Sequence, residues 1–271
     1  MAEAPVVAVR KLVPWPDCRL ARVEGDASPR EGEVWVVREA GYLWLGRVGR
    51  CAPSGQDSRL VLVRRAEEVD LRAHEEGRKI AADRLRVAQR EAKRLGLPMK
   101  FVAAEQSLHG DFIRLFFLAP QRVDFRKLVK LLSRAFQARV ELRQVGPRDA
   151  ARMVGGIGVC GRETCCATFL CEFRPITLKM AFDQSLVIAP QRLTGICGRL
   201  RCCLAFEHPH YRELLGGLPK VGKKVRTGEV EGRIVAYNIF RRVAVIEKGD
   251  GTRIEVPWEE LRGSGPRAGA P

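Results

Sequence analysis

Short runs of alternating hydrophobic and polar residues dominate the first 65 positions of the chain. Turn-forming sequences such as Gly25-Asp26-Ala27-Ser28-Pro29 separate these runs. Short strands bounded by Gly, Pro, Asp and Ser clusters are typical of a small antiparallel barrel or sandwich. We therefore predict a β-rich domain at residues 1–65, with strands at 6–9, 33–37, 43–48 and 60–63.

The pattern changes at residue 66 to apolar residues scattered among charges of both signs, and it stops at Gly96 and Pro98. Gly and Pro commonly mark the end of a helix, so residues 66–97 are predicted to form one long exposed helix or a helical hairpin.

Residues 98–215 combine both periodicities and are predicted to form a central α+β domain. Strands are expected at 101–106 and 112–118, joined by a turn at His109-Gly110-Asp111, with a further strand at 140–145. Between them, apolar residues recur at helical spacing over 123–136. The hairpin is rich in aromatics that could stack on nucleic-acid bases or fill a buried sheet face: Phe101, Phe112, Phe116 and Phe117.

The last part of the chain again alternates at the period of a strand. Residues 224–226, 232–237, 243–247 and 253–256 are the expected strands of residues 216–262, and Gly249-Asp250-Gly251 is a hairpin turn. We predict an SH3-like barrel here and a disordered tail at residues 263–271. The fold class is therefore α+β.

The chain has a net charge of +16, which points to an anionic partner such as nucleic acid, an acidic protein or a membrane surface. The first residues lack the basic and apolar regions of a signal peptide. No apolar run approaches the ~20 residues of a membrane span, so no membrane insertion is expected. We predict a cytoplasmic protein, whose thiols stay reduced.

Cysteines supply the strongest chemical signal. The pattern C-G-R-x-x-C-C occurs twice, at residues 160–166 and 197–203, and seven of the nine cysteines lie between Cys160 and Cys203. Clustered cysteines in a reducing compartment indicate a metal, a cluster or redox chemistry rather than disulfides. Glycine after the first cysteine suits a tight turn, and we expect a short helix after each turn.

Helical spacing after the first copy places Cys166, Phe169, Leu170 and Phe173 on one face. The second cysteine of each pair would then be buried, and the first would point about 100° away. Four cysteines remain to bind a tetrahedral zinc or an iron–sulfur cluster, and the spacing does not choose between them. These predicted ligands are Cys160, Cys165, Cys197 and Cys202. A cysteine-lined core without metal is the alternative.

Other polar residues give weaker signals. Lys179, Asp183 and Gln184 lie in an apolar setting and could form a site or satisfy backbone groups, while His208 and His210 follow the second motif as surface residues or substitute ligands. The sequence contains no Ser/His/Asp arrangement, glycine-rich phosphate loop or HExxH motif. A redox enzyme using adjacent cysteines would lack a general base. We therefore expect neither an enzyme nor a small-molecule substrate.

Three stretches give the chain a family resemblance. They read M-V-G-G-I-G-V-C-G-R-E-T-C-C, T-L-K-M-A-F-D-Q-S-L and T-G-I-C-G-R-L-R-C-C-L, with further matches at residues 123–129 and 140–146. This combination closely resembles the RicT (YaaT) family of bacterial proteins, which carry the polymerase-suppressor C-terminal domain. The resemblance extends from about residue 5 to 260.

The resemblance implies a cytoplasmic, non-enzymatic regulatory subunit. Proteins of this family assemble with the small helical partners RicA and RicF, carry 4Fe–4S clusters, and act with RNase Y in mRNA processing and turnover. In spore formers they are linked to sporulation, competence and biofilm development. The cofactor-binding cysteines that match the family motif are Cys160, Cys165, Cys166, Cys197, Cys202 and Cys203. The alternative is an RNA-binding scaffold with a structural zinc or no metal, suggested by the net charge, the C-terminal barrel and Arg241-Arg242.

Overall fold

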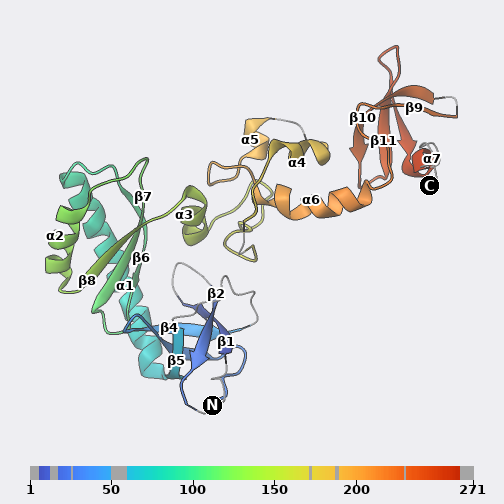
Figure 1. Cartoon of the computed structure of the whole chain (residues 1–271). Coiled ribbons are helices and arrows are strands. Elements are labelled where there is room, and N and C mark those ends of the chain that lie inside the picture. The colour runs from blue at the N-terminus through green and yellow to red at the C-terminus, as the bar shows by residue number, and fades with distance from the viewer. Residues whose placement is uncertain are drawn as a thin grey trace, which may run out of the picture. The chain divides into compact units, whose positions relative to one another are not determined.

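The computed structural model describes residues 6–12, 18–25, 27–49, 60–170, 173–186, 189–228 and 230–262 (Figure 1). The chain divides into two compact units, and each is described by itself. The first comprises Met1–Glu172 with Ile196–Gly198, and the second comprises Phe173–Gly195 with Arg199–Pro271. Helices and several separate sheets make the fold α+β, as predicted.

A closed barrel of five strands begins the first unit. Its order is β1-β2-β5-β3-β4, and β1 pairs with β4 to close it. The interior is filled by apolar side chains of alternate residues, including Val9, Trp35 and Leu62. The four predicted strands are confirmed, and a fifth, β2, was not predicted. The strands are β1 (Val6–Lys11), β2 (Cys18–Val23), β3 (Val34–Glu39), β4 (Tyr42–Val48) and β5 (Leu60–Arg65).

One uninterrupted helix, α1 (Glu68–Arg94), follows the barrel, so the helical-hairpin alternative is wrong. Glu67 and Asp70 form a capping box at its start, and Gly96 adopts a positive φ just past its end. The buried face of α1 consists of alanines, whose small side chains let the helix lie close to the neighbouring sheet: Ala81, Ala88 and Ala92.

A three-stranded sheet, in the order β6-β7-β8, packs against α1. β6 (Lys100–Gln106) and β7 (Phe112–Leu118) form the predicted hairpin, and α2 (Arg126–Phe136) connects β7 to the parallel strand β8 (Arg139–Gln144). Helices α1 and α2 cover one face of the sheet, and α3 (Pro147–Val154) packs on the other.

Successive residues of a strand point to opposite faces. With both faces covered, Phe116 and Phe117 are each buried, in different clusters of the core. Phe101 and Phe112 are buried as well. The four aromatics therefore belong to the core, and the base-stacking interpretation of them is wrong.

Aromatic ring contacts and a backbone hydrogen bond join the barrel to this sheet. The ring centroid of Tyr42 lies 4.4 Å from that of Phe112, and the Trp44 ring meets Phe112 edge-on at 5.9 Å. The backbone amide of Leu108 donates to the carbonyl of Leu43 over 2.8 Å. These contacts therefore attach the sheet to the barrel, while the two cores remain separate clusters.

The second unit begins with three short helices and ends with a sheet. α4 (Leu178–Asp183), α5 (Pro190–Leu193) and α6 (Cys202–Leu214) pack around Ala181, Leu193 and Leu204. The last sheet has the antiparallel order β12-β11-β10-β9 and is followed by α7 (Trp258–Arg262). Its strands are β9 (Lys224–Thr227), β10 (Val230–Asn238), β11 (Val243–Glu247) and β12 (Arg253–Pro257).

The four C-terminal strands lie where they were predicted, and their described pairings form an open sheet. The SH3-like closure and the predicted division into five segments stay predictions. The predicted tail at 263–271 lies outside the described residues. Within the part of the chain that the structure describes, no helix is both long enough and apolar enough to cross a membrane.

Candidate functional site: the twin cysteine loops

The two C-G-R-x-x-C-C copies fold into loops with the same backbone hydrogen bonds. An isolated antiparallel bridge closes each loop, Ile157 with Glu163 in the first and Thr194 with Leu200 in the second. The sequence repeat is therefore also a structural repeat, because residues at equivalent positions form the same closing contacts.

Inside each bridge, a glycine amide donates across the loop. The Gly158 amide donates to the Arg162 carbonyl over 2.8 Å, and the Gly195 amide donates to the Arg199 carbonyl over 2.9 Å. One step further out, the equivalent bonds run from Thr164 to Gly156 and from Arg201 to Leu193, at 3.0 and 2.9 Å.

The glycine after the first cysteine makes each turn possible. Gly161 has φ +78° and Gly198 has φ +72°, a region that side chains with a Cβ enter only with strain. This agrees with the turn expected from the sequence. The motif arginines that follow these glycines, Arg162 and Arg199, are both exposed.

The six motif thiols differ in exposure. Cys166 is buried, as predicted, and Cys160 is exposed at the tip of the first loop. The other four are half-buried: Cys165, Cys197, Cys202 and Cys203. The second cysteine of the pair is therefore buried in the first copy, as expected, but not in the second copy.

The segments that follow the loops are not equivalent. A true helix, α6, follows the second loop, whereas turns follow the first. The amide and the hydroxyl of Thr168 both donate to the Thr164 carbonyl over 3.2 Å, but the Leu170 amide then donates five residues back, to the Cys165 carbonyl over 2.9 Å, which is not the pattern of an α-helix. Phe169 and its counterpart Phe206 are more than half exposed, so the predicted apolar face is wrong for both.

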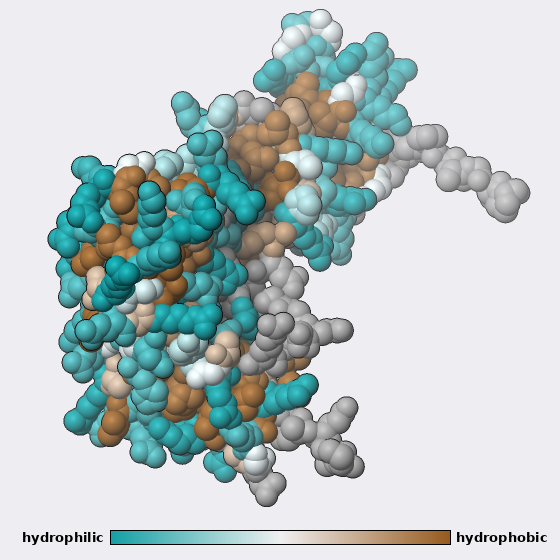
Figure 2. Space-filling model, turned by 60° about the vertical axis from the view of Figure 1, so that its left-hand side comes forward, coloured by the Kyte–Doolittle hydropathy of each residue, from teal (hydrophilic) through white to brown (hydrophobic). Residues whose placement is uncertain are grey.

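Exposed apolar side chains lie directly beside the exposed or half-buried thiols. Val159 precedes Cys160 and is 61% exposed, and Ile196 precedes Cys197 and is 51% exposed. Ile196–Gly198 group with the first unit, where Ile196 lies 3.4 Å from the position of a Cβ on Gly156. Hydrophilic side chains dominate the face shown in Figure 2, and hydrophobic ones reach its surface in patches. Exposed apolar groups that gather around one structural feature typically mark an interaction surface.

Among the residues that the structure describes, no three histidine, cysteine, aspartate or glutamate side chains converge as a metal site. Thiolates are nevertheless the donors that zinc and iron–sulfur clusters prefer. The assignment of Cys160, Cys165, Cys197 and Cys202 as ligands therefore stays a prediction, as does the wider set that includes Cys166 and Cys203.

Two weaker candidates from the sequence are brought together in the second unit. The His208 Nε2 atom lies 2.8 Å from a carboxylate oxygen of Asp183, and the Gln184 amide donates to the Leu204 carbonyl over 2.7 Å. These polar residues therefore tie α4 to α6. Beside them is a pocket of about 510 Å³, lined by Arg174, Met180, Ala205, His208, Pro209, Arg212 and Glu213.

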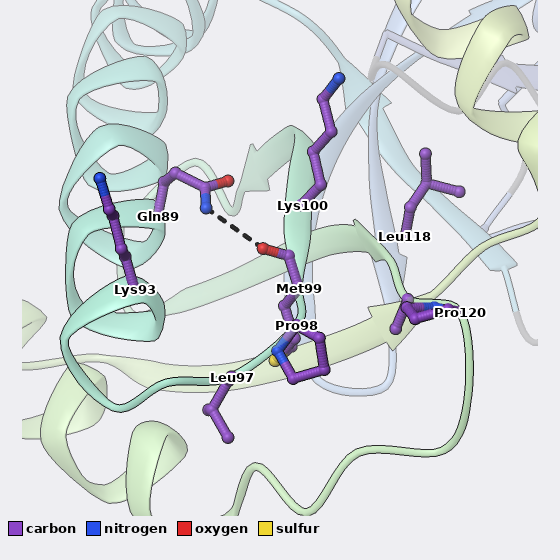
Figure 3. A pocket seen from close by; sticks show the side chains of 9 residues that line it. Gln89, Lys93, Leu97, Pro98, Met99, Lys100, Leu118 and Pro120 are labelled. Atoms are coloured by element: carbon purple, nitrogen blue, oxygen red, sulfur yellow. Dashed lines mark hydrogen bonds between the residues drawn. The ribbon is translucent and has the colours of Figure 1, made fainter.

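A second pocket, of about 410 Å³, lies at the end of α1 (Figure 3). Gln89 on α1 donates to the Met99 carbonyl over 3.2 Å and accepts from the Phe101 amide over 2.9 Å, so its amide acts as a strand partner at the edge of β6. The walls are largely apolar, with Lys93 and Lys100 as the charged lining residues. This arrangement stabilises the edge of the sheet and suggests no chemistry.

Buried charged residues were missed by the sequence reasoning. The Lys11 side chain, only 6% exposed, binds Glu39 over 2.6 Å inside the barrel region, and Arg114 binds the buried Glu105 on the sheet. The one signal in the sequence was the alternation of a strand: Lys11 lies two residues after the inward-facing Val9, so its side chain points to the same face.

The fold and the site together correspond to a defined class of protein. Residues 61–145, from β5 to the end of the three-stranded sheet, match the PSP1 C-terminal conserved region. Residues 175–218, which include the second cysteine loop and α6, match the third domain of PSP1-like proteins.

A characterised relative makes the assignment more specific. The chain is 42% identical over 201 residues to stage 0 sporulation protein YaaT of Bacillus subtilis (strain 168), an alignment that covers 74% of this chain and 73% of the relative. The chain therefore belongs to the YaaT (RicT) family of PSP1-domain proteins, and the predicted family is confirmed. No solved structure matches it.

Proposed function

We propose that this protein is a non-enzymatic regulatory subunit that acts in the cytoplasm through assembly with other proteins. RicA-like and RicF-like helical proteins and RNase Y are the proposed partners, and mRNA processing and turnover is the proposed process. Membership of the YaaT family supports the regulatory role, because the relative carries a sporulation name.

The observation that carries the proposal is the pairing of thiols with exposed apolar side chains on two matched loops. Val159 and Ile196 expose apolar surface at the tips, next to Cys160 and Cys197. A partner chain that covers these tips would bury both side chains, and burial of apolar area is the main driving force of protein association.

The motif cysteines are the proposed holders of a 4Fe–4S cluster, with zinc as the alternative. Since no three candidate ligands converge among the described residues, the proposal includes ligands from partner chains. A cluster held at the loops would make assembly sensitive to iron supply and redox state. Cys160 and Cys197 would contribute thiolates from the loop tips, and Cys165 and Cys202 would contribute them from the following segments.

Anaerobic co-purification of the tagged chain with its partners, followed by iron and sulfide analysis, tests the cluster. Wild-type protein and Cys51→Ala, a cysteine outside both motifs, should retain iron, whereas Cys160→Ser and Cys197→Ser should lose it. A colourless, iron-free complex that still contains all partners would refute the cluster and leave the assembly proposal standing.

The apolar tips are tested separately. Val159→Asp and Ile196→Asp should abolish partner capture, because each places a charge in the proposed contact, while Val69→Asp, at an exposed position of α1, should not. If the two tip variants capture partners as well as wild type does, the loops are not the assembly surface.

A second candidate function, an RNA-binding scaffold, is favoured by the net charge of +16. Binding that relies on phosphate contacts weakens steeply with salt, because each neutralised phosphate releases counterions. An RNA affinity that is absent, or that does not change with salt, would exclude this function.

A further inference from the structure

The turn between β10 and β11 exposes an aromatic side chain to an unusual extent. Phe240 is 92% exposed, the highest value among the large hydrophobic side chains of the described residues. Its neighbour Ile239 packs on the core of the C-terminal sheet instead. One residue thus anchors the turn, and the next is directed into solvent.

Hydrogen bonds and an ion pair brace this turn. Asn238 Oδ1 accepts from the Arg241 amide over 3.1 Å, and the Arg241 guanidinium binds both carboxylate oxygens of Glu255, at 2.9 and 2.7 Å. The carbonyl of Arg242 accepts from the Trp258 amide over 3.0 Å. These bonds order the backbone that carries the exposed ring, and a site that is ordered before binding loses less entropy when it binds.

The surroundings of the ring favour a nucleic-acid base over a protein partner. Two arginines, Arg241 and Arg242, follow Phe240 directly, and Arg242 is exposed. Single-stranded nucleic acids are bound by aromatic rings set among cations, and the net charge of +16 favours such an anionic partner.

We propose that the β10–β11 hairpin is a contact for single-stranded RNA in which Phe240 stacks on a base and Arg242 binds a phosphate. This inference rests on the second candidate function and gives it a site. Stacking on an aromatic ring tolerates any base, so the contact is not sequence-specific.

Fluorescence anisotropy of the full chain with a 12-nucleotide oligouridine tests the proposal. Phe240→Ala should weaken binding about 10-fold, within the range found for base-stacking aromatics. Phe240→Trp should restore affinity, and its added fluorescence should be quenched by the RNA. Val69→Ala, at a 73% exposed apolar position of α1, should bind as wild type does.

An oligonucleotide of the same length without bases separates stacking from charge. Wild type and Phe240→Ala should bind this probe equally, since no base is present to stack on the ring. Arg242→Ala should instead reduce the salt dependence of binding by about 0.7 in the log–log slope, as expected for one lost phosphate contact with a single strand.

The outcomes distinguish the site from the function. If wild type binds RNA with the expected salt dependence and Phe240→Ala is unchanged, the hairpin inference is overturned and the RNA function stands. If Phe240→Ala weakens both probes equally, stacking is wrong. If wild type does not bind RNA, the second candidate function and the inference both fail. Loss of a protein partner without loss of RNA affinity would reassign the hairpin to a protein contact.

Discussion

Replacing Lys11 by methionine should destabilise the barrel more than the same replacement of an exposed lysine would. The Lys11 ammonium lies 2.6 Å from Glu39 Oε2 and 4.5 Å from the centre of the Trp44 ring. Arg19 binds the other oxygen of Glu39 over 2.9 Å. The Glu39 side chain is only 13% exposed, so the lysine charge is compensating a carboxylate that water reaches poorly.

The size of the effect follows from these contacts. Removing one partner of a buried ion pair costs about 3–5 kcal/mol, because the other charge is left buried without compensation. Arg19 remains as a partner in the variant, although its side chain is 31% exposed. We therefore expect a loss of about 3 kcal/mol at neutral pH, a large part of the roughly 5–15 kcal/mol that stabilises a typical domain.

The effect should depend on pH in a defined direction. Burial raises the pKa of Glu39, and the charges of Lys11, Arg114 and Arg19 lower it further than burial raises it, so its pKa lies below 4.5. A carboxyl with a lowered pKa contributes stability above its unfolded pKa and loses that contribution as the pH falls through its folded pKa. In Lys11→Met the pKa of Glu39 should rise, so the difference from wild type should shrink as the pH falls from 7 to 3.

Urea unfolding followed by tryptophan fluorescence measures this difference. Trp35 and Trp44 are buried in the barrel region, and a Trp258→Phe background removes the signal of the C-terminal sheet. Lys100→Met, at an exposed position, is the matched control, and Lys11→Met with Glu39→Leu should recover stability because no charge is left buried. A loss below 1 kcal/mol at pH 7, or a penalty that is the same at pH 3.5, would refute the reasoning.

Three further predictions concern the cysteine loops and the C-terminal sheet. Gly161→Ala and Gly198→Ala should each cost about 1–2 kcal/mol of loop stability by backbone strain alone, since no atom lies within 4 Å of either new Cβ; clearly unequal protection in hydrogen exchange of the two loops would contradict their equivalence. Gly232→Ala should cost about 3 kcal/mol and sharply lower the melting temperature of the C-terminal sheet, because the new Cβ would lie 2.4 Å from the Glu247 carbonyl oxygen. An unchanged melting curve would show that β10 and β11 move apart at this point without loss of stability. Burial raises the pKa of Tyr237 to about 12, so its contribution to stability is present below pH 10 and is lost as the pH rises through 12; Tyr237→Phe should lack this alkaline loss in pH-dependent unfolding, and an identical profile would place the loss elsewhere.

Local patterns in the chain were sufficient to predict most individual elements. Alternation located β1, β3, β4 and the C-terminal strands, and helical spacing located α2, because these periodicities follow from the geometry of neighbouring residues. The twin loops were also predictable: the motif repeats, and each turn needs a glycine at the same place. The family could be named from the same residues, and the comparison with YaaT confirms it.

Long-range pairing decided everything that local patterns left open. Val9 pairs with Val48 to close the barrel, and nothing in the sequence around either residue predicts this pairing. Phe116 and Phe117 are both buried because helices cover both faces of their sheet. Phe169, in the turns after the first loop, and Phe206, in helix α6 after the second, are both exposed because no core among the described residues packs against either ring.

The same division holds for the chemistry. The spacing of the motif identifies the candidate cysteines, since a tight turn and a pair of thiols are local features. Which side chains meet, such as Asp183 with His208 or Lys11 with Glu39, depends on elements far apart in sequence being packed together. Burial and charge compensation belong to the packed chain as a whole, because they depend on how much water each group loses when distant segments come into contact.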